Sequence, residues 1–387
     1  MKWRKMEMAM ILSLGTCNPQ YQVNQETTSA FIEKLFSKHH QDINRLLQVV
    51  QNGEILKRHI SAPADWFEHK HSFQEKNELY IKTAVELGVE AIDRCLEHEQ
   101  LKTLLGRKVS CDEIDAIFFV SSSGIATPTI DARIMNLRSF SPHTKRVPIW
   151  GLGCAGGVAG ISRAFDYCKA YPEANVLVLC IELCSLTFQR EDYSKSNLIG
   201  TSLFADGVAC ALVSGDQSNL LNWRKGLIAS SEASARKAIP RVFDTMSTFM
   251  PNSEDVMGWD LKDDGLYVVF SKDIPSIIRR WLKPNLEEFL TRNNIAAKDI
   301  KHFVAHPGGK KVLQAYRDAL QLDFEMTEKS RLVLQQYGNM SSPTVLFVLS
   351  EFMESTYNAN QCREGDIGIM LALGPGFSSE LALIKWT

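Results

Sequence analysis

The sequence predicts an α/β protein made of two similar halves. Short apolar segments alternate with helical patterns, three kinds of segment recur in the same order, and corresponding segments keep almost the same spacing. The 387 residues allow one large or two medium domains, and 45% hydrophobic with 23% charged residues is ordinary for a globular protein. A net charge of −2 gives no support for binding nucleic acid or an anionic membrane.

Each half contains a polar turn with a buried strand, the start of a small-residue helix, and a second apolar strand. These are residues 113–121, 153–158 and 175–180 in the first half, and 299–305, 338–343 and 367–372 in the second. Phe119 lies 35 positions before Cys154, and Phe303 lies 36 before Asn339. Chance similarity between apolar strands is the alternative, but three parallels in one order favour a duplication.

The duplication predicts where the halves join and what they bring together. The polar stretch 214–219 marks the join, so we expect an N-terminal half over residues 1–221 and a C-terminal half over residues 222–387. Equivalent helix starts packed face to face would place Cys154 and Asn339 around one cavity.

The remaining composition bears on the compartment. Apolar runs such as residues 116–120 are far too short to span a bilayer, and residues 1–7 are interpreted as a short lead-in to a first strand rather than a signal peptide. Nine cysteines at irregular spacing, with no CxxC pair, argue against a disulfide framework and a zinc site. This usage fits a reducing cytoplasm.

Cys154 is the strongest candidate for a nucleophile. It lies in residues 151–157 (GLGCAGG), between an apolar strand and a helix. A thiol at a helix start faces the positive end of the helix dipole, which favours the thiolate. A buried cysteine is more often a small hydrophobe, and that is the interpretation of the other eight.

His306 and Asn339 are the candidate partners of this nucleophile. His306 ends an apolar strand in residues 303–309 (FVAHPGG), and Asn339 lies in residues 337–342 (YGNMSS). An imidazole can keep a cysteine ionised as its base, and two N–H donors on one oxygen stabilise an enolate or oxyanion. The alternatives are a core histidine and a helix N-cap. Together the three residues predict covalent acyl transfer.

A third segment is rich in glycine. Gly374, Pro375 and Gly376 follow the last paired strand, where small residues permit close backbone approach to a ligand. Taken alone, this segment is a turn.

These segments resemble the signatures of chalcone synthase-like type III polyketide synthases. The resemblance lies in residues 150–157, 305–309, 337–342 and 374–377, and extends from about Ile11 to Trp386. The sequence NMSS at residues 339–342 separates this family from the initiating ketoacyl synthases. Residues 148–151 and 253–260 most resemble bacterial, Bacillus-type alkylpyrone synthases.

The resemblance implies a thiolase fold with a layered αβαβα arrangement, a homodimer, and CoA thioesters as substrates with no metal or redox cofactor. Cys154 would carry the starter acyl group, while His306 and Asn339 would hold the malonyl-CoA carbonyl during decarboxylation. Long-chain fatty acyl starters would yield alkylpyrones by lactonisation. The alternatives are alkylresorcinols by aldol closure, a ketoacyl synthase III-like enzyme, a Cys-dependent acyl hydrolase and a non-catalytic member. Whether the starter arrives on CoA or on an acyl carrier protein stays open.

The resemblance also assigns residues for substrate choice. Phe204 matches the gatekeeper phenylalanine and Val268 a second gatekeeper, where a smaller side chain leaves room for an alkyl starter. Thr187, Gly200 and Ser341 match cavity positions, and Gly374, Pro375 and Gly376 form the cyclisation loop. Candidate cations for the CoA phosphates are Arg45, Lys57, Arg58, Lys310 and Lys311. Without the resemblance, the cavity positions would be core packing and the cations ordinary surface residues.

Overall fold

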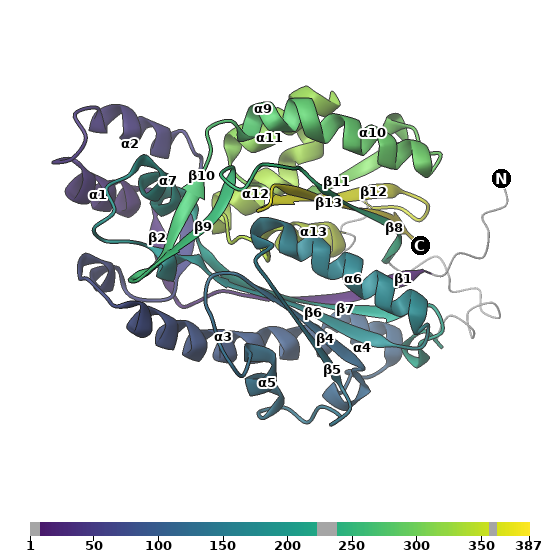
Figure 1. Ribbon diagram of the computed structural model, residues 1–387. Coiled ribbons are helices and arrows are strands. Elements are labelled where there is room, and N and C mark those ends of the chain that lie inside the picture. The colour runs from purple at the N-terminus through teal and green to yellow at the C-terminus, as the bar shows by residue number, and fades with distance from the viewer. Residues whose placement is uncertain (1–7, 223–237, 356–361) are drawn as a thin grey trace.

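The structure is a computed structural model that describes residues 8–222, 238–355 and 362–387. Its elements stack in five layers, in which two layers of strands separate three layers of helices (Figure 1). Both strand layers belong to one nine-stranded sheet, whose two halves lie on opposite sides of a central pair of helices. This confirms the predicted layered αβαβα arrangement.

The sheet order shows how the halves meet. Across the sheet the strands are β11 (Ile300–Ala305), β12 (Ile367–Gly374), β13 (Ser378–Trp386), β8 (Pro240–Phe249), β1 (Ala9–Cys17), β7 (Asp206–Gly215), β6 (Asn175–Leu183), β4 (Ala116–Ser121) and β5 (Lys145–Trp150). Two residue pairs, Ala9 with Val242 and Met10 with Arg241, join β1 to β8 at the centre.

The order of strands repeats on the two sides of this join. β4 is parallel to β6, and β6, β7 and β1 follow one another in antiparallel pairs. Likewise β11 is parallel to β12, and β12, β13 and β8 follow in antiparallel pairs. The predicted strands at 116–120 and 299–305 are β4 and β11. The boundary between residues 221 and 222 stays a prediction.

The helices form three layers, one between the two layers of strands and one outside each of them. The central helices are α6 (Gly156–Ala170) and α13 (Thr344–Ser355). Beyond the N-terminal strands lie α3 (Phe73–Leu96), α4 (Glu99–Leu105) and α5 (Ile130–Met135), and beyond the C-terminal strands lie α9 (Ile274–Ile277), α10 (Lys283–Arg292) and α11 (Lys310–Leu320). α12 (Glu328–Tyr337) precedes α13.

Alternation along the strands explains this layering. In β6, Val176 and Val178 belong to the core around α6 and α13, whereas Leu177 and Leu179 belong to the core under α3. A strand buried on both faces is mostly apolar, as the sequence of β6 is between Val176 and Ile181. Small residues let α6 pack closely against α13, because a Cβ on Gly157 would lie 2.3 Å from the carbonyl oxygen of Ser342, just before α13.

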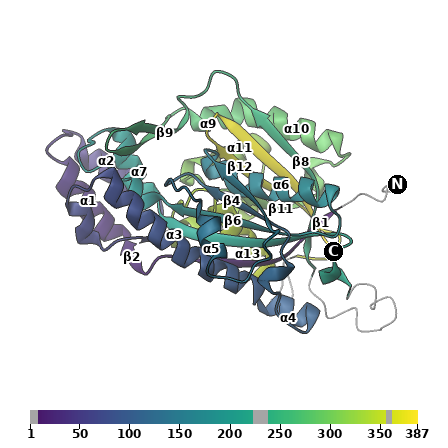
Figure 2. The same ribbon diagram turned by 60° about the horizontal axis from the view of Figure 1, so that its bottom comes forward.

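A group of smaller elements gathers at one end of the layers, on the left in Figures 1 and 2. They include two antiparallel pairs, β2 (Tyr21–Asn24) with β3 (Lys57–Ile60) and the hairpin of β9 (Met257–Lys262) with β10 (Gly265–Phe270). The helices of this group are α1 (Gln25–Phe36), α2 (Ile43–Gln51) and α7 (Lys195–Leu203). Within the described ranges, no helix has the length and apolar character needed to cross a lipid bilayer.

Candidate active site

Cys154 lies in a tight turn that leads into α6. Residues Gly153–Ala155 form one turn of 3₁₀ helix, and the cysteine side chain is 7% exposed. Gly153 has a φ of +46°, and a Cβ there would lie 2.8 Å from the Pro375 ring. Glycine is therefore needed at this position both for its backbone conformation and for the close packing.

Asn339 reaches the same place from the other half. Its backbone pairs with the chain around Phe204, accepting from Ala205 N (2.9 Å) and donating to Leu203 O (3.0 Å). The Cys154 thiol donates to the amide oxygen Oδ1 over 3.9 Å, and Ser341 N donates to the same oxygen over 2.8 Å. The amide nitrogen Nδ2 is thus the group of Asn339 left to donate to a substrate oxygen. The predicted meeting of Cys154 and Asn339 is present.

His306 follows the end of β11. Its backbone N donates to Leu371 O of β12 (2.8 Å), and Gly308 N donates back to its carbonyl (3.1 Å), so the parallel strands hold the residue at the sheet edge. The side chain is 2% exposed, and within the described residues neither ring nitrogen has a hydrogen-bond partner. Burial lowers the pKa of the ring to about 3, so the imidazole is neutral at pH 7.

The ionisation of Cys154 differs from the sequence prediction. Burial raises the pKa of the thiol from 9.0 to about 12; hydrogen bonds with Ser341 and Asn339 lower it, and the carboxyl of Glu182 raises it. A helix N-terminus contributes about 0.3–1 kcal/mol, whereas each pKa unit corresponds to about 1.4 kcal/mol. The dipole therefore cannot offset the burial. Burial thus favours the neutral thiol and the neutral imidazole over a thiolate held by His306.

Glu182 is a buried acid that the sequence analysis missed. It is fully buried at the end of β6, where its carboxylate oxygens accept from Ser122 N (3.0 Å), Ser122 Oγ (2.8 Å) and Ser342 Oγ (3.2 Å). Burial raises its pKa, and these serines oppose that rise. One feature of the sequence could have identified it, since Glu182 interrupts an otherwise apolar strand.

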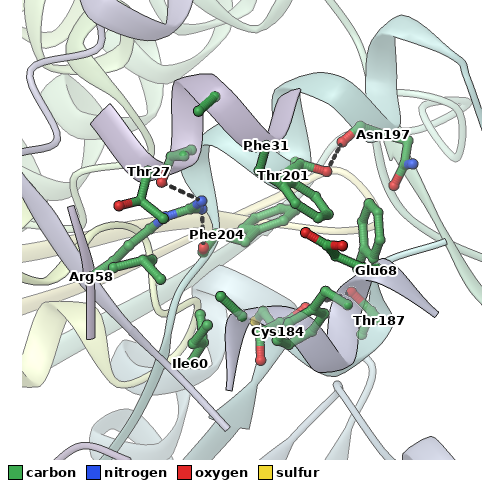
Figure 3. A pocket seen from close by; sticks show the side chains of 18 of the residues that line it. Thr27, Phe31, Arg58, Ile60, Glu68, Cys184, Thr187, Asn197, Thr201 and Phe204 are labelled. Carbon is green, nitrogen blue, oxygen red and sulfur yellow. Dashed lines mark hydrogen bonds between the residues drawn. The ribbon is translucent and has the colours of Figure 1, made fainter. Parts of the chain in front are cut away.

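An apolar cavity of about 420 Å³ opens beside this site (Figure 3). Four of the five predicted cavity residues line it, namely Thr187, Gly200, Phe204 and Val268. Ser341 is not among its lining residues and lies instead next to Cys154. Phe204 connects cavity and site, because its backbone pairs with Asn339 while it lines the cavity.

Arg58 is part of this cavity wall and is buried. Its guanidinium donates to Phe204 O (2.7 Å) and to Thr28 Oγ1 (3.1 Å), which ties β3 and α1 to the segment of Phe204. Burial lowers its pKa to about 10, so Arg58 stays charged at pH 7. The other predicted CoA contacts differ in setting: Arg45 is exposed on α2, and Lys310 pairs with Glu54 over 2.7 Å. Phosphate binding by these residues stays a prediction.

The glycine-rich segment begins at Gly374, the last residue of β12, and its predicted approach to a ligand stays a prediction. A Cβ on Gly374 would lie 2.4 Å from Leu152 O and 2.6 Å from the Ala155 side chain. Gly374 therefore lets β12 press against the turn that carries Cys154. Gly376 has a φ of +131°, which also favours glycine. Among the described residues, no group of three or more His, Cys, Asp or Glu side chains could hold a metal ion.

Known proteins resemble this chain in sequence and in fold. The family model "Chalcone and stilbene synthases, N-terminal domain" matches residues 1–217, and "Chalcone and stilbene synthases, C-terminal domain" matches residues 241–386. The chain belongs to the chalcone and stilbene synthase family. It is accordingly a type III polyketide synthase, an acyltransferase with the thiolase fold.

Relatives and solved structures agree with this assignment. A putative chalcone synthase of Bacillus subtilis (strain 168) is 47% identical over 98% of this chain and 99% of its own length. A 1,3,6,8-tetrahydroxynaphthalene synthase of Streptomyces peucetius subsp. caesius is 31% identical over 97% of this chain and 93% of its own. The crystal structure of 1,3,6,8-tetrahydroxynaphthalene synthase from Streptomyces coelicolor A3(2) has a TM-score of 0.85 at 27% identity and covers 98% and 99% of the two chains.

Proposed function

We propose that this enzyme extends a long-chain fatty acyl starter, held on Cys154, with malonyl units and releases alkylpyrones. The observation that carries the proposal is the meeting of Cys154 Sγ with the Asn339 amide at 3.9 Å, next to a cavity that Phe204 joins to the site. His306 lies buried with both ring nitrogens unpaired among the described residues, as a proton carrier for this thiol would be.

The first step loads the starter. The Cys154 sulfur attacks the thioester carbonyl of an acyl-CoA, the bond to the CoA sulfur breaks, and an acyl-Cys154 thioester forms. Because the resting thiol and imidazole are neutral, His306 takes the thiol proton during attack and returns it to the leaving CoA thiolate. One thioester replaces another, so the exchange is nearly balanced in free energy.

The second step makes the carbon–carbon bond. The malonyl carboxylate leaves as carbon dioxide, and its bonding electrons pass to the thioester oxygen as an enolate. Asn339 Nδ2 and the His306 ring donate to that oxygen. The enolate carbon attacks the acyl-Cys154 carbonyl, and the carbon–sulfur bond breaks with Cys154 leaving as the thiolate. His306 passes a ring proton to this thiolate and recovers one from water, so each extension takes up one proton from solvent. The bond changes balance through loss of carbon dioxide, so the reaction needs no metal or redox cofactor.

The size and the apolar lining of the cavity support the proposal of an alkyl starter. Its volume of about 420 Å³ falls within the range of about 300–1,000 Å³ that is usual for ligand pockets. Three phenylalanines, Phe31, Phe67 and Phe188, pack edge to face along its wall, with ring centroids 5.6 and 6.2 Å apart. An apolar chain gains from such a wall, whereas a polar starter would lose its hydration there.

The proposal includes a homodimer. Strand β5 is the edge of the sheet, and its Val147 and Trp150 are 36% and 56% exposed. Ile125, next to the Gly124 carbonyl that accepts from Trp150, is 42% exposed. An edge strand with exposed apolar side chains suits pairing with a second copy. A mass of one chain by light scattering would contradict this part of the proposal.

The proposed compartment is the cytoplasm. All nine cysteines are free thiols, which fits a reducing environment. The starter can come from CoA or from an acyl carrier protein, and the two donors are distinguished by supplying each of them to the purified enzyme with malonyl-CoA.

The experiment that tests the function uses purified protein, malonyl-CoA and a series of acyl-CoA starters of increasing length. We expect release of carbon dioxide and alkylpyrones, identified by mass spectrometry, with the highest kcat/KM for long chains. Resorcinols would replace the proposed cyclisation by aldol closure. Free fatty acid together with intact malonyl-CoA would overturn the proposal in favour of a hydrolase.

A further inference from the structure

One gatekeeper lies on an element that is attached to the rest of the protein by few polar contacts. Val268 lies on β10, opposite Trp259 of β9, and the Trp259 ring packs against Phe204 with centroids 5.7 Å apart. These two strands pair with each other and not with the nine-stranded sheet. The position of the hairpin β9–β10 therefore sets how far Val268 and Trp259 stand from Phe204.

Within the described residues, one hydrogen bond links these two strands to the rest of the protein. Gln189 Nε2 donates to Leu266 O over 3.0 Å, two residues before Val268 on the same strand. Gln189 is 4% exposed, and Asn197 fixes its backbone by donating to its carbonyl over 2.8 Å. The fit is tight, because a Cβ on Gly265 would lie 2.6 Å from Gln189 Nε2.

A buried lysine donates a hydrogen bond to the side chain of Gln189. Lys76, in the first turn of α3, is 7% exposed and donates to Gln189 Oε1 (2.7 Å) and to Phe188 O (3.1 Å). Burial lowers its pKa to about 8; the charge of Asp264, in the turn of the hairpin, raises it, and Lys70 lowers it. Burying an ammonium group is costly unless its protons are bound. Lys76 therefore bonds the backbone of Phe188 in the cavity wall and lies close enough to the hairpin turn to feel the charge of Asp264.

We propose that Lys76 and Gln189 are positioning residues that hold the hairpin β9–β10 against the cavity and so determine which acyl starters the enzyme accepts. Lys76 orients the Gln189 amide, and the amide nitrogen then fixes Leu266 and, through it, Val268. Neither residue lines the cavity, so neither contacts the starter. The choice of starter rests on the proposed function, whereas the holding of the hairpin does not.

Two measurements test the proposal with one set of variants. Lys76→Met removes the charge, Gln189→Leu removes both bonds, and Gln189→Glu keeps the acceptor for Lys76 while removing the donor to Leu266. Lys76→Arg is the conservative variant that restores a charged donor. Lys82→Met, on the exposed face of α3, is the matched control.

Hydrogen exchange measures the hairpin directly. We expect amides of residues 257–270 to exchange about tenfold faster in Lys76→Met, Gln189→Leu and Gln189→Glu, with Lys76→Arg and Lys82→Met within about twofold of the wild type. Unchanged exchange in Gln189→Glu would overturn the proposal. That variant also keeps the test decisive if the loss of Lys76 prevents folding.

Competition between long and short acyl-CoA starters measures whether the hairpin position affects the choice of starter. We expect the ratio of kcat/KM between long and short acyl-CoA starters to change about fivefold through the KM of the starter, with the KM for malonyl-CoA held within about twofold. Faster exchange with an unchanged ratio would overturn the role in selection. A wild-type protein that forms no polyketide from any starter would overturn the proposed function, while the exchange data would still decide whether Lys76 and Gln189 hold the hairpin.

Discussion

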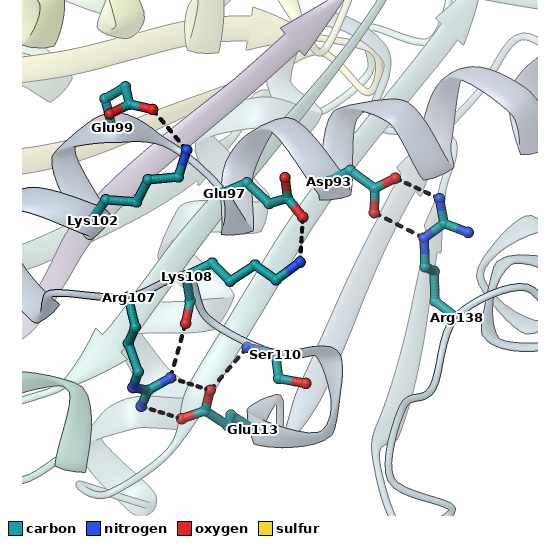
Figure 4. Close-up of polar contacts among 9 residues, drawn as sticks. All are labelled: Asp93, Glu97, Glu99, Lys102, Arg107, Lys108, Ser110, Glu113 and Arg138. Carbon is teal, nitrogen blue, oxygen red and sulfur yellow. Dashed lines mark hydrogen bonds and ion pairs between the residues drawn. The ribbon is translucent and has the colours of Figure 1, made fainter.

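Two polar regions of this protein face opposite environments. The surface ion-pair cluster joins Asp93 to Arg138, Glu97 to Lys108, Glu99 to Lys102 and Glu113 to Arg107, around the end of α3 and α4 (Figure 4). Its partners bond at 2.5–2.8 Å, and their side chains are between 20% and 76% exposed. The buried polar groups of Cys154, Glu182, His306 and Asn339 have almost no contact with solvent.

The two regions shift proton affinities in opposite directions. In the surface cluster the charged forms are favoured: Arg107 lowers the pKa of Glu113, and Glu97 raises the pKa of Lys108. In the buried site the neutral forms are favoured, since burial raises the pKa of Cys154 and lowers that of His306. In the proposed function these neutral groups exchange protons with a substrate, whereas paired surface charges serve mainly the folded state.

The largest effect is expected at the nucleophile. Cys154→Ala removes the atom that carries the acyl chain, so polyketide formation should fall by about 10⁴-fold or more. Mass spectrometry of the products measures this loss, and circular dichroism with a melting curve checks the fold. Substantial polyketide from a folded Cys154→Ala protein would show that another group carries the chain.

Removing an oxygen-binding donor should have the next largest effect. Asn339→Ala and His306→Ala should each slow malonyl-CoA decarboxylation by about 10²–10³-fold, because each removes one donor to the enolate oxygen. Release of carbon dioxide measures this step, and intact-protein mass measures loading of the starter, which should fall less.

Asn136→Ala is the control for this comparison, since Asn136 is exposed and its side chain bonds its own helix at Ala132 O. Decarboxylation at the wild-type rate in Asn339→Ala would remove Asn339 from the site.

The meeting of distant residues could be predicted because it depends on local patterns. Cys154 and Asn339 stand at equivalent helix starts, His306 follows a strand, and each position is marked by glycines or proline. The duplication then brings the helix starts together, as the 3.9 Å contact shows. Phe204 and Val268 were placed by family resemblance, and both line the cavity.

The charge state of the site could not be predicted in the same way. The pKa of Cys154 depends on every atom that replaces water around it, and those atoms come from segments as far apart as Glu182 and Ser341. Likewise, Arg58 looks like a surface cation in the sequence, but the packing of α1 and β3 buries it. The packing of Gly374 against the turn that carries Cys154 is a further contact between distant segments, while its approach to a ligand stays a prediction.

The neutral thiol can be tested by alkylation. With a pKa of about 12, the rate at which iodoacetamide labels Cys154 should rise about tenfold for each pH unit from 7 to 10, because only the thiolate reacts. Glu182→Gln removes a neighbouring carboxyl that raises this pKa, so labelling at pH 7 should become a few times faster. Peptide mass spectrometry resolves Cys154 from the other cysteines. A rate that levels off near pH 7 would instead indicate the thiolate that the helix dipole alone predicts.

The smallest effect is expected in the surface ion-pair cluster. Arg107→Ala removes two bonds of 2.7 Å to Glu113, but the Arg107 side chain is 50% exposed and water can replace these bonds, so the free energy of unfolding should fall by about 1 kcal/mol or less. Lys102→Ala should change it less, because its partner Glu99 is more exposed. Both losses should shrink in 1 M salt, which screens surface charges. Urea unfolding measures them, and activity should not change. A loss of several kcal/mol that persists in high salt would mean that the cluster is not screened by water, and the contrast with the buried site would fail.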